Sequence, residues 1–107
     1  MHTSKARVVS LPVAFGGWRG TLSIHDDLVR IESPNGAKQV SLDLGQVKRA
    51  SFNSNNGLWV FRLEDGRRVR FQSAGLLLSA DRTEAGQQTN EAIQERLRHH
   101  RIRLLGI

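Results

Sequence analysis

The sequence predicts a mainly β domain, a curled antiparallel meander or barrel of six or seven strands capped by one C-terminal α-helix. Two observations carry this prediction. Short stretches that alternate apolar and polar residues fill the first two thirds of the chain, separated by turns of the Asn-Gly and Asp-Gly type. After residue 73 the apolar period becomes that of an amphipathic helix. We expect one domain over 1–107, with strands at about 7–73, a linker at 74–80 and a helix at about 82–105.

The first strands follow from a period of two. A strand is expected at 8–13, broken or bulged at Pro12, because proline cannot donate a hydrogen bond to a sheet. Residues 18–25 alternate apolar and polar side chains, as in a strand with one solvated face. The pair Asp26-Asp27 then turns the chain into the next alternating stretch.

The middle of the chain continues this pattern through two Asn-Gly turns. The Pro-Asn-Gly sequence at 34–36 predicts a hairpin, because Asn-Gly tolerates the positive φ angles of a tight turn. Residues 39–44 alternate as a strand, and Gly45 predicts a bend or bulge. A strand over 47–52 then leads to the second Asn-Gly turn at 55–57.

The last two strands flank the Asp-Gly turn at 65–66. In the stretch 58–63 both faces are mostly apolar, which predicts a central strand covered on both sides. The stretch 68–72 alternates again. The alternation assigns these aromatic rings to the core: Trp59, Phe61 and Phe71.

A capping box and an apolar stripe predict the C-terminal helix. Asp81 and Glu84 have the spacing in which the first side chain accepts from early backbone N–H groups and the second reaches back. A helix over about 82–105 is ~36 Å long at 1.5 Å per residue. The narrow apolar stripe of this helix must pack against another apolar surface, and we expect it to pack on the open end of the curled sheet. The stripe consists of Ala85, Thr89, Ala92, Ile93, Leu97 and Leu104.

The composition limits the classes of protein that fit. Cysteine is absent, which excludes a disulfide framework and thiolate chemistry. No apolar run approaches the ~20 residues of a membrane-spanning helix, and residues 1–10 lack an apolar stretch of signal-peptide length. We therefore expect a cytoplasmic protein, and the initial Met favours a whole small protein. The net charge of +6, from 16 basic and 10 acidic residues, favours an acidic partner.

The run of strands resembles the pleckstrin-homology (PH) superfold, in which a C-terminal amphipathic helix closes a curled meander. The resemblance covers about 18–104 and rests on strand and turn patterns. It is carried by the stretches Gly20–Ile24, Leu28–Ile31, Lys38–Leu42, Val47–Phe52, Leu58–Leu63 and Glu64–Phe71. These run as in bacterial PH-like and GRAM-like domains, and they are similar to the N-terminal PH-like domain in the smaller subunit of the histone chaperone FACT. The resemblance implies a PH-like fold.

Two departures limit what this resemblance implies about ligands. After the last strand, the FACT-type pattern continues with an acidic residue, Gly and Phe, where this chain has Gln-Ser-Ala-Gly at 72–75. PH domains that bind phosphoinositides hold the headgroup with a Lys/Arg cluster in the first hairpin. That region here has Arg7, Arg19 and Arg30, close to two aspartates.

Catalytic and metal chemistry are not expected. The chain has no Cys or Tyr, no glycine-rich phosphate loop and no Walker sequence. His25 lies beside Asp26 and Asp27, but in a predicted surface turn rather than in a pocket where nucleophile, base and orienting group converge. His99 and His100 are adjacent in the predicted helix and point about 100° apart, which suits chelation poorly. We predict no enzyme activity, no cofactor and no bound metal.

Two clusters of basic residues are the candidate binding sites. In the first, Arg68 and Arg70 share one face of a strand, and Arg62 joins them if the neighbouring strand presents it on the same side. The members of this cluster are Arg62, Arg67, Arg68 and Arg70, with Lys48 and Arg49 as additions. Such a patch suits phosphate backbones or an acidic protein segment. The other interpretation is a solvated sheet face.

The second basic cluster lies in the C-terminal tail, where basic and apolar residues mix. Its candidate residues are Arg98, Arg101 and Arg103. One interpretation is a basic amphipathic element for an anionic membrane or an acidic partner. In the other, Leu104 and Ile107 complete the packing against the sheet. A third feature is the linker run Leu76, Leu77 and Leu78, which either plugs the barrel beside the helix or forms a self-association patch.

These observations predict a non-catalytic interaction domain. Its expected partner is a protein with an acidic surface or segment, held by strand edges or by the groove between helix and sheet. Direct binding to a polyanion, either nucleic acid or an anionic lipid surface, is an alternative that uses the same residues. A homo-oligomeric structural module, built through the three leucines or an open sheet edge, is the other alternative.

Overall fold

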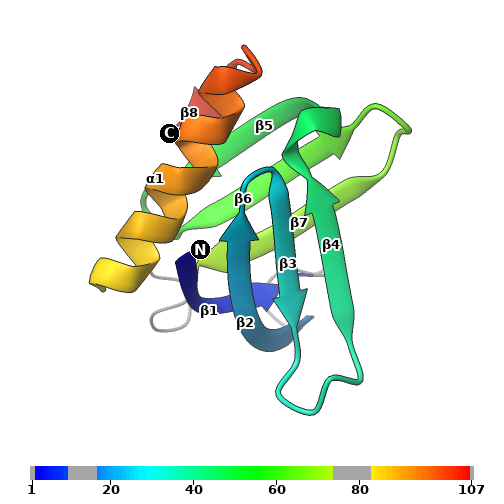
Figure 1. Ribbon diagram of the computed structural model, residues 1–107, viewed down its shortest axis with the longest axis vertical. Coiled ribbons are helices and arrows are strands. Elements are labelled where there is room, and N and C mark those ends of the chain that lie inside the picture. Colours follow the sequence, from blue (N-terminus) through cyan, green and yellow to red (C-terminus); the bar gives the residue numbers. More distant parts are fainter. Residues whose placement is uncertain (1, 10–16, 74–82, 107) are drawn as a thin grey trace.

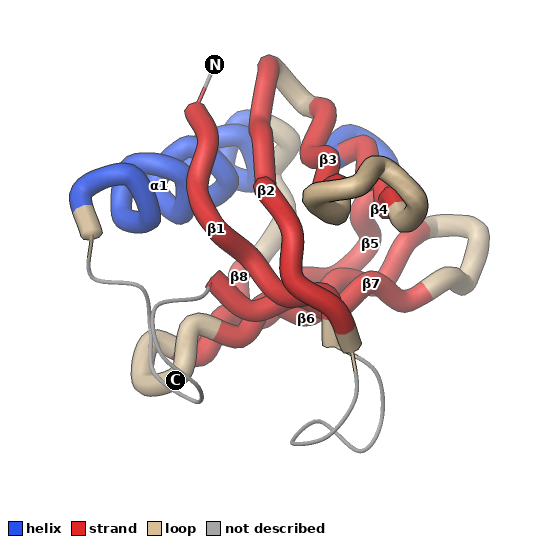
Figure 2. The backbone as a smooth tube through the Cα atoms, turned by 90° about the horizontal axis from the view of Figure 1, so that it is seen from below, coloured by secondary structure: helices blue, strands red, loops and turns tan. Residues whose placement is uncertain are grey.

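The computed structural model describes residues 2–9, 17–73 and 83–106, which form one open sheet of eight strands with a single α-helix (Figure 1). The elements in chain order are β1 (His2–Val8), β2 (Trp18–His25), β3 (Leu28–Glu32), β4 (Gln39–Asp43), the 3-10 turn η1 (Leu44–Gln46), β5 (Val47–Asn53), β6 (Leu58–Leu63), β7 (Arg68–Ser73), α1 (Glu84–His99) and β8 (Leu104–Gly106). The predicted fold class, a mainly β curled sheet with a C-terminal helix, is confirmed. The sheet curls without closing into a barrel (Figure 2).

The sheet has two halves, β4 to β1 and β7 to β8, which are joined by the pairing of β1 with β7. The strand order is β4-β3-β2-β1-β7-β6-β5-β8. Neighbouring strands are antiparallel except β8, which runs parallel to β5. α1 packs mainly on β1, with further contacts to β2 and η1. β1 begins at His2, earlier than the predicted start near residue 7, and residues 10–13 of the predicted first strand lie outside the described residues.

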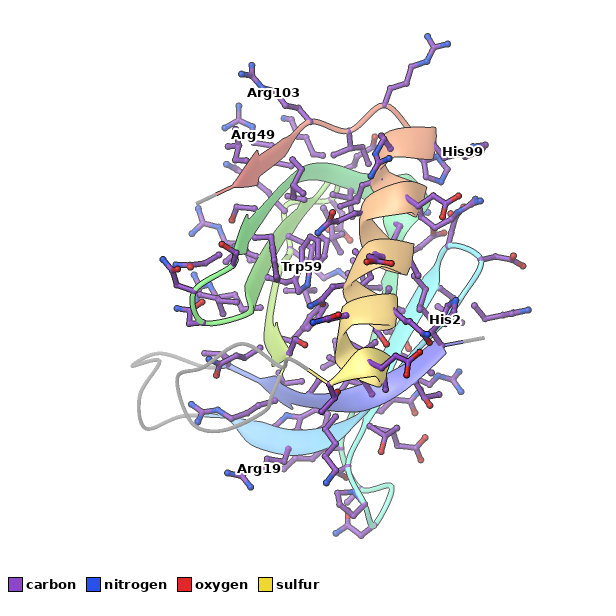
Figure 3. All side chains as sticks on the ribbon, turned by 90° about the vertical axis from the view of Figure 1, so that its left-hand side faces the viewer. His2, Arg19, Arg49, Trp59, His99 and Arg103 are labelled. Carbon is purple, nitrogen blue, oxygen red and sulfur yellow. The ribbon has the colours of Figure 1, made fainter. Side chains whose placement is uncertain are left out.

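The inward-facing aromatic side chains stack at the centre of one apolar core. Trp59, Phe61 and Phe71 are fully buried. Ring centroids are 5.3 Å apart for Trp59 and Phe61 and 5.5 Å apart for Phe61 and Phe71. The indole Nε1 of Trp59 donates to Oδ1 of Asn90 at 3.0 Å, which ties β6 to the helix (Figure 3). The prediction that alternation turns these rings inward is confirmed.

The outer face of β6 differs from the prediction. β6 is a central strand between β5 and β7, as expected. On its outer face, however, Leu58 and Val60 are only half-buried and Arg62 is exposed. The helix lies on the inner side of the sheet, where it packs mainly on β1, β2 and η1 and accepts a hydrogen bond from Trp59 of β6. The prediction that β6 is covered on both sides is therefore wrong, and a sheet face is left accessible.

The predicted turns are present, with glycine at positions that need a positive φ. Gly36 and Gly57 of the two Asn-Gly turns have φ angles of 71° and 72°. The break expected at Gly45 takes the form of η1, where Oδ1 of Asp43 accepts from the Gly45 N–H at 2.8 Å. The Asx-type hydrogen bond lets the chain change direction between β4 and β5.

A β-bulge follows in β5 at Lys48. The pairing with β6 skips Lys48, so β5 has an extra residue between Val47 and Arg49. An extra residue of this kind lets two consecutive side chains share one side of a strand. Lys48 and Arg49 are both exposed, whereas Val47 and Ala50 on either side of them are buried.

α1 begins at Glu84, and its N-cap is Thr83. The Thr83 hydroxyl accepts from the N–H of Gly86 at 3.1 Å. The residue predicted for this role, Asp81, lies outside the described residues. Ala85 is exposed rather than part of the apolar stripe. The buried residues of the helix are Gly86, Thr89, Ile93 and Leu97.

The helix ends at His99, before the predicted limit near 105. The chain reverses in a Schellman motif, in which the N–H of Ile102 donates to the oxygen of Leu97 at 2.9 Å and that of Arg101 to Arg98 at 3.0 Å. Arg101 takes the left-handed position of the motif, with φ of 57°. Glycine is the usual residue there, so the ordinary stop signal is absent. Among the described residues, no helix is both long and apolar enough to span a membrane.

Candidate interaction surface

Three arginines lie side by side on the outer face of the second half of the sheet. Arg49 of β5 pairs with Arg62 of β6, and Arg62 pairs with Arg68 of β7. Register partners on neighbouring strands point to the same face, and the strands are about 4.8 Å apart. All three side chains are exposed. The structure therefore brings the predicted residues Arg62 and Arg68 together and adds Arg49 to them.

β8 extends this alignment to a fourth arginine. Its pairing with β5 aligns Leu104 with Ala50, which places Arg103 next to Arg49. Leu104 packs against the core, so the preceding side chain, Arg103, faces outward and is exposed. Figure 3 shows Arg49 and Arg103 at the same corner of the molecule. We call the following four residues the basic row: Arg103, Arg49, Arg62 and Arg68.

The basic row carries positive charge that no nearby carboxylate neutralises. Within the described part of the chain, none of its four arginines forms an ion pair. Like charges placed directly opposite each other on neighbouring strands destabilise a sheet. The basic row thus concentrates positive charge, and the repulsion between its arginines lowers the stability of the fold. It suits a ligand that brings several negative charges at once.

The residues alongside the basic row are more apolar. The same register aligns Leu105, Ser51, Val60 and Arg70 across β8, β5, β6 and β7. Leu105 is 54% exposed, and Val60 is half-buried. Arginine beside exposed apolar groups is the composition found in protein–protein interfaces.

Arg67 is already engaged within its own turn. Its Nε donates to Oδ2 of Asp65 at 2.9 Å, and its backbone N–H donates to Oδ1 at 2.9 Å. The backbone hydrogen bond, followed by that from the side chain, holds the pKa of Asp65 below its usual value. Arg67 was predicted as part of the sheet cluster, but it lies in the β6–β7 turn with its charge paired.

The predicted tail cluster is divided by the early end of the helix. Arg98 is exposed in the last turn of α1, Arg101 is exposed in the reversal, and Arg103 reaches the outer face of the sheet. These three arginines therefore do not lie along one helix. Lys48 is exposed at the bulge, adjacent to the basic row. The leucines at 76–78 lie outside the described residues.

A second polar cluster joins the helix to the β2–β3 turn, and we call it the Asp27 junction. Nε of Arg96 donates to Oδ1 of Asp27 at 2.7 Å, and Nε2 of His100 lies 2.9 Å from the same oxygen. The backbone oxygen of Asp27 also accepts from the N–H of Leu44 at 2.8 Å, which adds η1 to the junction. The hydrogen bond from Arg96 is the main reason that the pKa of Asp27 lies below its usual value, and the same bond raises the pKa of Arg96.

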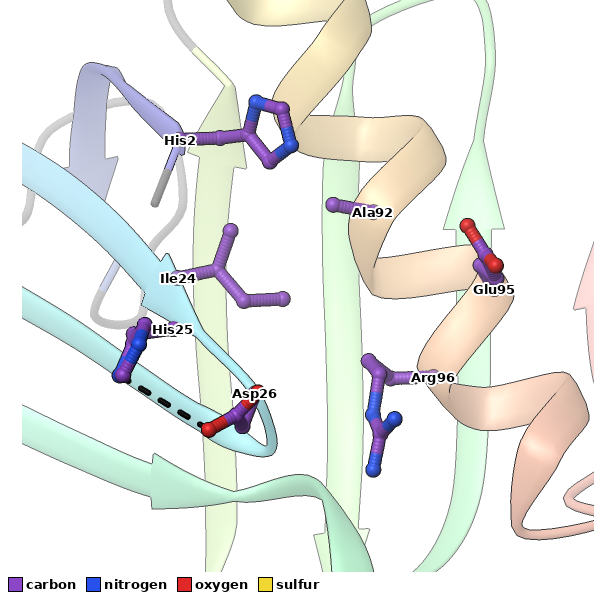
Figure 4. A pocket seen from close by; sticks show the side chains of 7 residues that line it. All are labelled: His2, Ile24, His25, Asp26, Ala92, Glu95 and Arg96. Carbon is purple, nitrogen blue, oxygen red and sulfur yellow. Dashed lines mark ion pairs between the residues drawn. The ribbon is translucent and has the colours of Figure 1, made fainter.

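A polar pocket of about 370 Å³ lies beside the Asp27 junction (Figure 4). Nδ1 of His25 is 3.9 Å from Oδ2 of Asp26 at its rim. Among the described residues, its lining contains no hydroxyl, thiol or amine side chain. In the described ranges, no three His, Cys, Asp or Glu side chains are placed to hold a metal ion. The lining residues are His2, Ile24, His25, Asp26, Ala92, Glu95 and Arg96.

A groove of about 330 Å³ opens at one end of the basic row, where β1 stops pairing with β7. β1 pairs only with the C-terminal half of β7, and beyond it the Val9 N–H donates to the oxygen of Arg70 at 3.1 Å. Valines of β1, β4 and β7, with Val9 directly after β1, form the apolar walls, and arginines of β7 and the preceding turn form one side. We call it the valine groove, lined by Val8, Val9, Val40, Arg67, Arg68, Val69 and Arg70.

Comparison with known proteins finds a similar architecture among solved structures. No family model matches the sequence, and no curated protein matches it. The inner membrane complex sub-compartment protein 3 (ISP3) from Toxoplasma gondii has a similar fold, with a TM-score of 0.61. The two chains are 14% identical, and the match covers 92% of this chain and 77% of the ISP3 chain. ISP3 has a PH-like fold, so the curled sheet with its C-terminal helix is compatible with that fold.

The Asp27 junction was not found from the sequence, whereas Arg49 was named as a candidate without a reason for its outward position. Nothing in the sequence indicates the Asp27 junction, because Asp27 and Arg96 are 69 residues apart and each is an ordinary residue for a turn or a helix surface. The outward position of Arg49 did have a signal. Apolar residues at 47, 50 and 52 are spaced by three and then by two, which is the pattern of a strand with one extra residue.

Proposed function

We propose that this chain is a non-catalytic interaction domain of PH-like fold, and that its basic row binds an acidic segment of a protein partner. One observation carries the proposal. Three exposed arginines of the adjacent strands β5, β6 and β7, and Arg103 directly before β8, are aligned on the outer face of the sheet. The similarity to ISP3 supports the fold part of the proposal.

The chemistry of arginine fits a segment with several carboxylates. A guanidinium group forms two parallel hydrogen bonds with one carboxylate, whereas the ammonium group of lysine acts as a point charge. A single exposed ion pair contributes only about 0–1 kcal/mol, so useful affinity needs several pairs made together. Arginines on neighbouring strands, about 4.8 Å apart, offer such a set to one ligand. Salt screens exposed pairs, so the binding should weaken as ionic strength rises.

A protein partner is favoured over a nucleic acid by what lies beside the basic row. Base stacking needs exposed aromatic rings, whereas Trp59, Phe61 and Phe71 are fully buried. The neighbouring residues Leu105 and Val60 instead offer apolar surface, as the core of a protein interface does.

The test uses a fluorescently labelled peptide rich in Glu and Asp, with binding measured by anisotropy at low and near-physiological salt. The variant combines Arg49→Glu with Arg62→Glu. The matched control combines Arg30→Glu with Lys38→Glu, which changes the net charge equally. Arg30 is exposed on β3, and Lys38 is exposed directly before β4, both away from the basic row. We expect the row variant to bind at least about tenfold more weakly and the control to bind within about twofold of wild type. Urea denaturation checks that both variants fold.

Two results would count against this proposal. If both double variants lose affinity equally, only the net charge acts and the basic row is not a site. If a DNA duplex or anionic vesicles bind more tightly than the peptide, and the row variant abolishes that binding, the ligand is a polyanion rather than an acidic protein segment. In the measurement with the DNA duplex, the dependence of the affinity on salt concentration gives the number of phosphates that the protein contacts.

A further inference from the structure

The valine groove lies directly beside the basic row, because Arg68 belongs to both. We infer that this groove receives a single large apolar side chain from the same acidic segment. The partner would then be a short acidic stretch with one aliphatic or aromatic anchor next to its carboxylates. This inference rests on the proposed function and adds a requirement that charge alone does not impose.

The walls of the valine groove are apolar, and their side chains are partly or fully buried. Val9 and Val69 are buried, whereas Val8 and Val40 are half-buried and leave apolar surface facing the opening. Val8, Val40 and Val69 lie in β1, β4 and β7, and Val9 directly follows β1, so sheet positions form most of the walls. An anchor that fills such a space gains from burial of its own surface and of the valines together.

The charges around the valine groove determine which residues can flank the apolar anchor in the bound segment. Arg67 is paired with Asp65, but Arg68 and Arg70 have no ion pair among the described residues. Arg70 is also half-buried and belongs to the lining of the groove. An anchor flanked by carboxylates therefore matches the arginines on this side, whereas one flanked by lysine or arginine does not.

The size of the valine groove favours a side chain over a cofactor. Pockets that bury drug-sized ligands have volumes of about 300–1,000 Å³. At about 330 Å³, and open on one side, this groove is at the bottom of that range. A groove of this size suits one large side chain of a peptide whose main chain continues onto the basic row.

The test compares three labelled acidic peptides that differ at one central position, which is Leu, Ala or Ser. We expect wild type to bind the Leu peptide about tenfold to a hundredfold more tightly than the Ala peptide, the gain for burying a leucine side chain. Val40→Phe fills the groove and should reduce this Leu/Ala ratio to about one, with the affinity for the Ala peptide retained. Val8→Thr, which keeps the shape and makes the wall polar, should reduce the ratio without any added bulk. Leu28→Phe is the control, because Leu28 is exposed on β3 away from the groove.

The outcomes separate this inference from the proposed function. Equal binding of all three peptides, with affinity still lost in the Arg49→Glu/Arg62→Glu variant, overturns the anchor and leaves the basic row as the site. Absence of binding for every peptide overturns both proposals. Discrimination between the peptides that survives both Val40→Phe and Val8→Thr places the anchor elsewhere and overturns the groove assignment. Tight binding of decanoate without discrimination between peptides would assign the groove to an anionic amphiphile instead.

Discussion

Asp27→Asn should weaken the attachment of α1 to the β2–β3 turn while keeping the shape of the side chain. The substitution puts a neutral amide where a carboxylate accepts from Arg96 and lies 2.9 Å from His100. Hydrogen bonds to charged groups contribute about 1.5–3 kcal/mol, whereas exposed ion pairs contribute about 0–1 kcal/mol. The Asp27 side chain is 31% exposed and lies between these cases. We expect the free energy of unfolding to fall by about 1–2 kcal/mol.

The assay is urea denaturation followed by tryptophan fluorescence, with thermal melting as a second measurement. For a domain of this size, each kcal/mol lowers Tm by about 4–8 °C. The pKa of Asp27 lies below its ordinary value of 3.8 in the folded state. Its contribution is therefore complete above that value and is lost as the pH falls through the lower folded-state pKa. The stability gap between wild type and variant should stay constant from about pH 7 to pH 5 and shrink below pH 3.8.

Asp26→Asn is the matched control for this substitution. The Asp26 side chain is 83% exposed and 3.9 Å from His25, so its loss should change the free energy of unfolding by less than about 0.5 kcal/mol. Its φ of 53° is a conformation that asparagine tolerates. A double-mutant cycle with Arg96→Gln isolates the coupling between the two partners. Equal losses for the two aspartates, or strict additivity of Asp27→Asn and Arg96→Gln, would refute the reasoning.

Two further predictions concern single arginines. Arg62→Thr removes the charge between Arg49 and Arg68, so urea denaturation should show a gain of about 0.2–1 kcal/mol while the acidic peptide binds more weakly in anisotropy. A loss of stability would contradict the cost assigned to the like charges. Arg101→Gly should raise the free energy of unfolding by about 0.5–1 kcal/mol, because glycine adopts a φ of 57° without strain. Thermal melting measures this gain, and an affinity for the peptide that falls with it would place Arg101 in the site.

The strands and turns could be predicted because they depend on residues that are close in the sequence. In the stretch 18–25, the structure buries Leu22 and Ile24 and exposes Arg19 and Thr21, as the alternation requires. The pairing of Arg62 with Arg68 is equally local, since a tight Asp-Gly turn sets the register of the β6–β7 hairpin. This part of the candidate site was therefore within reach of the sequence.

The rest of the site depends on interactions that a local pattern does not encode. Whether the outer face of β6 is covered depends on where the helix docks. The alternation pattern around an apolar residue such as Val60 is the same in both cases, so the sequence alone does not reveal it. Arg49 faces outward because of the bulge at Lys48, and Arg103 reaches the sheet because the helix ends at a reversal without glycine. Arg98 and Arg103 therefore looked like parts of one helical tail, although the chain reverses between them.

The reversal at Arg101 links the proposed interaction surface to the end of the helix. The Schellman motif carries the chain from α1 to β8, which pairs with β5. A transient opening of the helix would withdraw Arg103 from the basic row and uncover the backbone edge of β5 in a single event. Local openings of this kind are seen by native-state hydrogen exchange. The β5 amides that face β8 thus report on helix opening, and a ligand that spans all four arginines slows their exchange without touching the helix.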